Sequence, residues 1–134
     1  MGFLDTEGFL KAINGDPEFR IAGRFWNAKI RVIVGAETLI IKIADGVVVD
    51  VSEPTGRNYM VDCREYDITI SAATREWEQL FAPEPRPFYH DLFAAVSRHG
   101  FDWGGDVKMW FTYYAALRQM FALMGRFASL RQEA

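Results

Sequence analysis

The stretch from Val107 to Leu130 constrains the fold of this chain more than any other part of its sequence. Fourteen of the eighteen residues from 107 to 124 are apolar. At helical steps of about 100°, polar and small residues form one stripe over roughly a third of the circumference. The remaining two thirds are apolar, which is far more than a helix at the surface of a protein needs to bury. The sequence therefore predicts one long apolar helix that must be covered on two sides. The stripe consists of Lys108, Thr112, Ala115, Gln119, Ala122, Arg126 and Ser129.

The apolar arc of this predicted helix divides into two adjoining sectors. The first sector contains Met109, Tyr113, Ala116, Leu117, Met120, Leu123 and Met124. The second sector contains Trp110, Tyr114 and Phe121. A sheet covers one sector and leaves the other for a second helix of the chain, for a partner subunit or for an apolar ligand. The sequence alone leaves these three options open.

Composition excludes several classes of function. The net charge is −3, and no run of like charge provides the basic face that a nucleic-acid partner requires. Because a central Arg118 costs about 2.5–3.5 kcal/mol on insertion into a bilayer, the apolar helix is not expected to span a membrane. One cysteine and two histidines predict neither a disulfide nor a metal centre, and no cofactor is expected. The N-terminus shows no signal peptide, which predicts a cytoplasmic location.

Period-two alternation dominates the first half of the chain. Ile30, Val32 and Val34 share one face of a predicted strand, and Asp45-Gly46 is a strong signal for a two-residue hairpin. A three-stranded antiparallel meander is expected from about 27 to 52, with further strands at 67–70 and 101–103. Helices are expected after Asp5 or Thr6, after Ser71, over 88–99 and after Asp106. Strands followed by helices favour an α+β fold in a single domain, residues 1–134.

The order of these elements resembles that of the sterol carrier protein type 2 family over roughly Phe19 to Met124. The resemblance is carried by Asp45-Gly46, by the helix after Ser71 with Trp77 and Leu80, and by the Gly105-Asp106 turn into the last helix. It implies a mixed, largely antiparallel five-stranded sheet with helices packed on one face, which enclose a tunnel for sterols, fatty acids or acyl chains. Two departures from the family pattern, Pro83–Pro87 and Asp102–Gly104, lie near the expected mouth of that tunnel.

The resemblance further implies a protein that binds and carries lipids without catalysing a reaction. The candidates for contact with such a ligand are apolar side chains of the last helix and of the wall that faces it. The last helix contributes Met109, Trp110, Tyr113, Leu117, Met120 and Phe121. The facing wall contributes Trp77, Phe81, Phe88 and Phe93. Specificity would come from the shape of the cavity and from polar groups such as Tyr113, Tyr114 or Arg57.

Two other classes of function compete with lipid binding. In an interaction protein, Trp110, Tyr114 and Phe121 would pack against a second copy of the chain or against an enzyme, as aromatic residues do at interfaces. In a small α+β isomerase or cyclase, Asp102 or His90 would act inside an apolar pocket. The first alternative predicts a homodimer formed through the last helix, and the second predicts a carboxyl group in the cavity whose pKa is strongly displaced.

Overall fold

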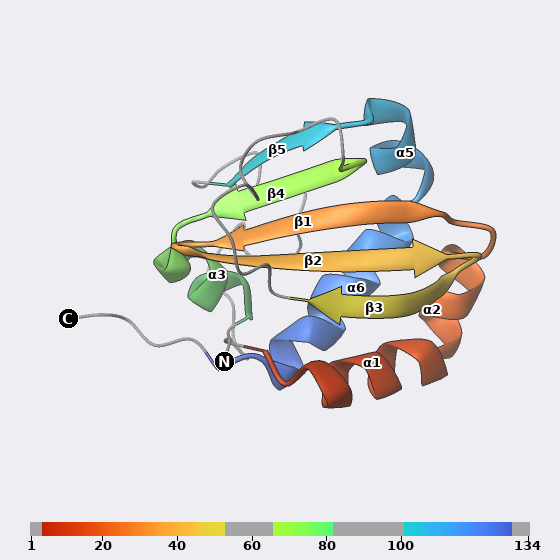
Figure 1. Ribbon diagram of the computed structural model, residues 1–134, viewed down its shortest axis with the longest axis horizontal. Coiled ribbons are helices and arrows are strands. Elements are labelled where there is room, and N and C mark those ends of the chain that lie inside the picture. Colours follow the sequence, from red (N-terminus) through yellow and green to blue (C-terminus); the bar gives the residue numbers. More distant parts are fainter. Residues whose placement is uncertain (1–3, 53–65, 82–100, 130–134) are drawn as a thin grey trace.

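The computed structural model of the protein describes residues 4–52, 66–81 and 101–129. Its strands are β1 (Ala28–Val34), β2 (Glu37–Ala44), β3 (Val47–Ser52), β4 (Ile68–Ala72) and β5 (Asp102–Gly105). The described helices are α1 (Thr6–Gly15), α2 (Pro17–Ala22), α3 (Thr74–Phe81), α5 (Val107–Thr112) and α6 (Tyr114–Phe127). The five strands form one sheet, and α6 crosses behind it (Figure 1). This arrangement confirms the predicted α+β fold.

The strand order is β3-β2-β1-β4-β5, so that β1 lies at the centre of the sheet. β1 pairs with β2 in the antiparallel sense and with β4 in the parallel sense. The β2–β3 and β4–β5 pairs are antiparallel, so the sheet is mixed and largely antiparallel, as predicted. The predicted hairpin joins β2 to β3, where Asp45 and Gly46 have φ values of 50° and 77°. Both values lie in the left-handed region that a type I′ turn requires.

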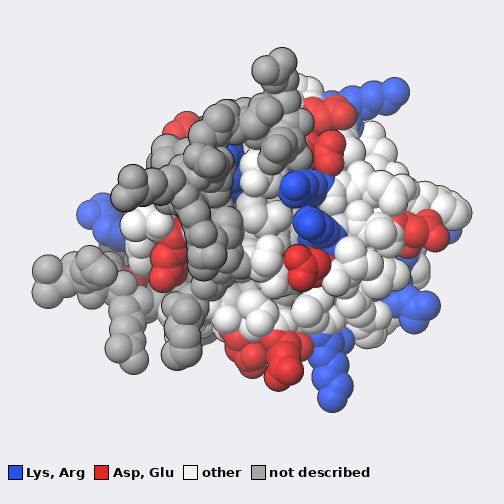
Figure 2. Space-filling model, in the orientation of Figure 1, with Lys and Arg blue, Asp and Glu red and all other residues white. Residues whose placement is uncertain are grey.

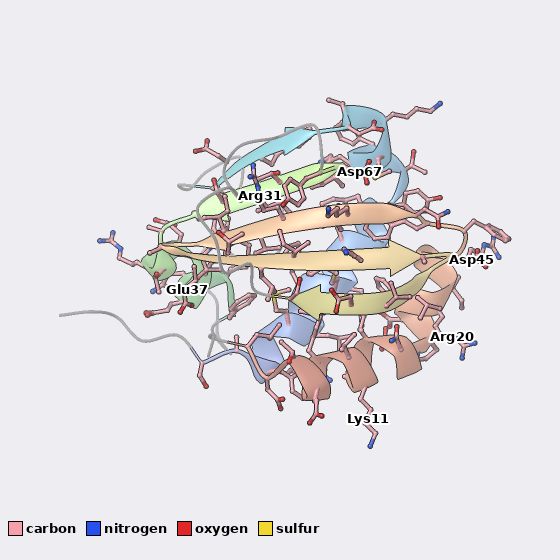
Figure 3. All side chains as sticks on the ribbon, in the orientation of Figure 1. Lys11, Arg20, Arg31, Glu37, Asp45 and Asp67 are labelled. Atoms are coloured by element: carbon pink, nitrogen blue, oxygen red, sulfur yellow. The ribbon has the colours of Figure 1, made fainter. Side chains whose placement is uncertain are left out.

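The two faces of the sheet differ in chemistry. The register places Ile30, Ile41 and Ile68 side by side on one face, and all three side chains are completely buried. Arg31 and Thr69 are a second register pair on the opposite face. Figure 3 shows the labelled Arg31 on the side of the sheet turned away from α6. The alternation in the sequence therefore separates an apolar face, which the helices cover, from a polar face.

Two short helices precede the sheet where the sequence predicts one. Asp5 caps α1 as expected, since its carboxylate accepts a hydrogen bond from the Gly8 amide at 3.2 Å. The Asp16 carboxylate then accepts a hydrogen bond from the Phe19 amide at 2.9 Å, and Pro17 occupies the first turn of α2. A proline at the first helical position sacrifices no hydrogen bond, so Pro17 begins a second helix rather than only ending the first.

Ser71 does not begin a helix, contrary to the sequence-based expectation. It pairs with Ile33 of β1 and with Asp102 of β5, and α3 begins at Thr74. Pairing with a strand on each side therefore overrides the local preference of serine for a helix start. The fifth strand is present but lies at Asp102–Gly105 instead of 101–103.

The prediction of one long C-terminal helix is wrong, because the helix breaks at Tyr113. This residue has φ −112° and ψ 21°, which lie outside the helical region, and it separates α5 from α6. The break costs little hydrogen bonding, since the Tyr113 amide donates to the Met109 carbonyl and the Tyr113 carbonyl accepts from the Leu117 amide. The Tyr113 ring stacks on Trp26, a tertiary contact that a helical projection does not contain. Within the described ranges, no helix is long and apolar enough to cross a bilayer.

Gly105→Ala is expected to lower the free energy of unfolding by at least about 2 kcal/mol. Gly105 has a φ of 117°, and a Cβ at this position would collide with the Asp67 carbonyl oxygen. Urea denaturation measures the loss. Gly104→Ala is the matched control, because nothing lies within 4 Å of its Cβ position, and it should leave stability unchanged or raised. Equal losses in the two variants would contradict the close approach of the two backbones as the cause.

Candidate functional site

The layer between the sheet and the C-terminal helices holds most of the side chains that the sequence predicts to contact a ligand. Five of them are buried, with at most 3% of their surface exposed: Trp77, Trp110, Leu117, Met120 and Phe121. Three more are half-buried and pack against the same core: Phe81, Met109 and Tyr113. The remaining two, Phe88 and Phe93, lie outside the described residues, as do Arg57 and the helix expected over 88–99.

Trp77 on α3 is the centre of a first aromatic group. Its ring centroid lies 5.6 Å from that of Phe81, 4.9 Å from that of Phe101 and 5.5 Å from that of Phe121. The Trp77 indole N–H donates a hydrogen bond to the Ile33 carbonyl at 3.0 Å. The group therefore ties α3 and α6 to the central strand, and it brings together three of the predicted contact residues.

Trp110 on α5 belongs to a second aromatic group. Its ring stacks on that of Trp103 in β5, with centroids 4.4 Å apart and an interplanar angle of 13°, and lies 5.8 Å from the Tyr114 ring. Trp110 is also the buried residue of α5, which attaches this short helix to the layer. In the sequence, Trp103 stands out only as a departure from the family pattern, and its pairing with Trp110 was not predicted.

Trp26 and Tyr113 form a third aromatic group that sequence reasoning missed. Their ring centroids are 4.9 Å apart, and the rings are nearly parallel at 10°. Trp26 is completely buried, although it precedes β1. The alternation that places Ala28 and Ile30 on the apolar face extends back to Trp26, so this pattern could have predicted its inward direction.

Helix α6 confirms the polar stripe predicted from the sequence, since Ala115, Ala122 and Arg126 are exposed. The apolar arc is in contact with α1, α2 and α3 of the same chain as well as with the core. Within the second sector, Phe121 packs against Trp77 of α3. Helices α1 and α2 also contact α6, a role for the N-terminal helices that was not predicted. Helices of the same chain, rather than a partner, cover this part of α6.

A hollow of about 230 Å³ lies on the opposite side of the sheet, beside β5. Its lining residues are Arg31, Thr69, Ser71, Asp102, Trp103, Gly104 and Gly105. The Arg31 side chain is only 6% exposed, and its guanidinium carbon lies 4.8 Å from the centroid of the Tyr66 ring. The Nζ atom of Lys29 lies 5.2 Å from the centroid of that ring.

The hollow beside β5 has one basic and one acidic residue in its lining, Arg31 and Asp102. Basic and acidic side chains both occur over the part of this face that is coloured in Figure 2. Across the described segments, no three His, Cys, Asp or Glu side chains come close enough together to hold a metal ion. Asp102 is exposed at this hollow, so it is not the carboxyl group inside the cavity that the isomerase alternative predicts. His90 lies outside the described residues.

Solved structures share this arrangement of helices and strands. A crystal structure of sterol carrier protein 2 matches with a TM-score of 0.70 at 14% sequence identity, over 91% of this chain and 94% of that chain. The chain has the sterol carrier protein 2 fold. A solution structure from Thermus thermophilus, of a conserved hypothetical protein named as a candidate sterol carrier protein, also gives a TM-score of 0.70. It is 14% identical and is matched over 100% of this chain and 94% of that chain.

The sterol carrier protein 2 fold confirms the resemblance that the order of elements indicates. No protein-family model and no curated protein matches the sequence. At 14% identity, the likeness lies in the arrangement of strands and helices rather than in shared residues. The likeness therefore establishes the fold and does not identify a ligand.

Of the three side chains proposed for a homodimer interface, Tyr114 is half-buried and the other two are buried in this sterol carrier protein 2 fold. Trp110 is 1% exposed and Phe121 is 3% exposed, so both pack inside the chain. The exposed apolar side chains of the described residues include Val107 and Phe111 on α5, which are 56% and 62% exposed. Since these two residues are four apart, they lie on one face of that helix.

Phe121→Ala is expected to lower the free energy of unfolding by about 3–5 kcal/mol, because it removes a buried ring from the Trp77 group. Phe111→Ala is the matched control with the same change of side chain at an exposed position, and we expect a change of less than about 0.5 kcal/mol. Thermal and urea denaturation of the two variants provide the comparison. Similar losses in both would contradict the assignment of Phe121 to the core and of Phe111 to the surface.

Proposed function

We propose that this protein binds and transfers an apolar ligand, such as a lipid, a fatty acid, an acyl chain or a sterol, without catalysing a reaction. The observation that supports this most directly is the likeness to sterol carrier protein 2, which extends over nearly the whole of both chains. The layer of aromatic and methionine side chains between the sheet and α5 and α6 is the surface suited to such a ligand. In this proposal the protein acts in the cytoplasm.

The driving force in this proposal is the removal of apolar ligand surface from water. Burial is favourable by about 25 cal/mol per Å², offset in part by the ordering of the ligand and of the side chains around it. Met109, Met120 and Met124 lie in or against the layer. Their unbranched, polarizable side chains adapt to irregular shapes. In this proposal the side chains of the layer pack against one another when no ligand is bound and rearrange around a bound ligand.

Helix α5 is the element that we expect to move when the ligand enters. It has six residues and buries one of them, Trp110, whereas α6 buries six. The energy needed to open a helix away from a core rises with the apolar surface that it buries. The break at Tyr113 separates the two helices, so that α5 can open while α6 stays in place.

Purified protein should therefore carry or take up apolar molecules. The four tryptophans all lie in the described layer or at its edge, so their fluorescence is expected to change when fatty acids or sterols are added. Native mass spectrometry and organic extraction of the purified protein provide an independent measurement. Absence of any bound lipid, together with an unchanged tryptophan spectrum, would contradict the proposal.

Met109→Ala is expected to weaken ligand binding by about five- to tenfold, because the variant loses apolar contact that is worth about 0.8 kcal/mol per methylene group. Met109 is half-buried against the core, so that the protein should remain folded. The neighbouring Lys108 is exposed, and Lys108→Ala should leave the affinity unchanged. Fluorescence titration with the same ligand compares the variants, and equal affinities for Met109→Ala and the native protein would place the ligand elsewhere.

A further inference from the structure

Trp26 carries a buried hydrogen-bond donor that has no acceptor in the described part of the chain. Its side chain is completely buried, and its Nε1 atom has no hydrogen-bond acceptor among the residues that the structure describes. Buried indole N–H groups usually have an acceptor, because an unpaired donor has lost its bond to water and gained nothing in exchange. Trp77 shows the ordinary arrangement, since its N–H donates to the Ile33 carbonyl at 3.0 Å.

The backbone holds Trp26 in this position from both sides. Its amide donates to the Gly23 carbonyl at 3.0 Å, and its carbonyl accepts from the Gly46 amide at 2.9 Å. The preceding residue, Phe25, has a φ of 68°, a left-handed value that aromatic residues rarely adopt. Strain of this kind persists only where the surrounding structure requires it, and it often accompanies a functional position. The indole is therefore held in place although its donor finds no acceptor among residues 4–52, 66–81 and 101–129.

Trp26 lies at the boundary of the proposed ligand site. Its ring stacks on Tyr113, with the centroids 4.9 Å apart. Tyr113 is the residue at which α5 separates from α6, and it packs against the core. A ligand that enters the layer beside α5 would therefore lie next to the Trp26–Tyr113 pair.

We propose that the Trp26 indole N–H donates a hydrogen bond to an oxygen atom at the polar end of the bound ligand. This inference rests on the proposed function and specifies the chemical class of the ligand. A single neutral donor does not compensate the free energy that a carboxylate loses when it is transferred from water to a buried site. A buried carboxylate needs a charged partner. The ligand is therefore an apolar molecule with an uncharged oxygen, either a hydroxyl or a carbonyl group.

Trp26→Phe removes the N–H and keeps an aromatic ring for the stack with Tyr113. The test compares 1-hexadecanol with hexadecane, both delivered from cyclodextrin, in titrations of native protein and variant. We expect the affinity for 1-hexadecanol to fall by about three- to tenfold and the affinity for hexadecane to stay the same. Trp103→Phe is the matched control, and it should preserve the ratio of the two affinities.

Three other outcomes of these titrations would contradict the inference, each in a different way. Equal losses for the alcohol and the hydrocarbon in Trp26→Phe would mean that the ring shape matters and the N–H does not. Unchanged affinities would exclude Trp26 from the site. If neither ligand nor any other lipid binds the native protein, the proposed function itself fails.

A measurement on the native protein gives an answer even if Trp26→Phe does not fold. In the ¹⁵N–¹H spectrum of the four indole groups, the Trp26 signal should shift further with 1-hexadecanol than with hexadecane. The Trp77 signal is the internal control and should shift little, because its N–H already donates to the Ile33 carbonyl. A Trp26 signal that does not respond to the alcohol would overturn the inference.

Discussion

The burial of one face of β1 is the constraint on which the rest of the structure depends. β1 pairs on both sides, so its backbone groups are satisfied within the sheet, and the isoleucine row that crosses it needs an apolar cover. The described helices provide that cover, and α1, α2 and α3 all contact α6. The opposite face of the same strand carries Lys29 and Arg31, which contact a shared aromatic ring. One strand therefore separates an apolar layer from a polar surface.

The break at Tyr113, whose ring stacks on Trp26, divides the C-terminal helical segment into two parts with different properties. Helix α6 buries six side chains and belongs to the core, whereas α5 is attached through Trp110 and its stack on Trp103. Because Tyr113 keeps its own backbone hydrogen bonds, the break removes little stability. The division places a short, weakly anchored helix beside the layer in which we propose that the ligand binds.

The proposed site depends on packing rather than on a catalytic constellation. The side chains around it are aliphatic, aromatic or methionine, and the polar atoms that face inward are few among the described residues. Such a surface can exclude water from an apolar molecule, and a single donor such as Trp26 can orient it. The hollow beside β5 lies on the other face of the sheet, so that Arg31 and Asp102 belong to a different surface.

Local patterns in the sequence determined the alternating strands, the Asp45-Gly46 turn, the caps at Asp5 and Asp106 and the exposed stripe of α6. These features follow from backbone conformation and periodicity, which neighbouring residues decide. Tertiary contacts alone decided the break at Tyr113, the strand position of Ser71 and the covering of α6 by the N-terminal helices. Each of these depends on residues far apart in the chain, and no local pattern contains the energy of a contact between such residues.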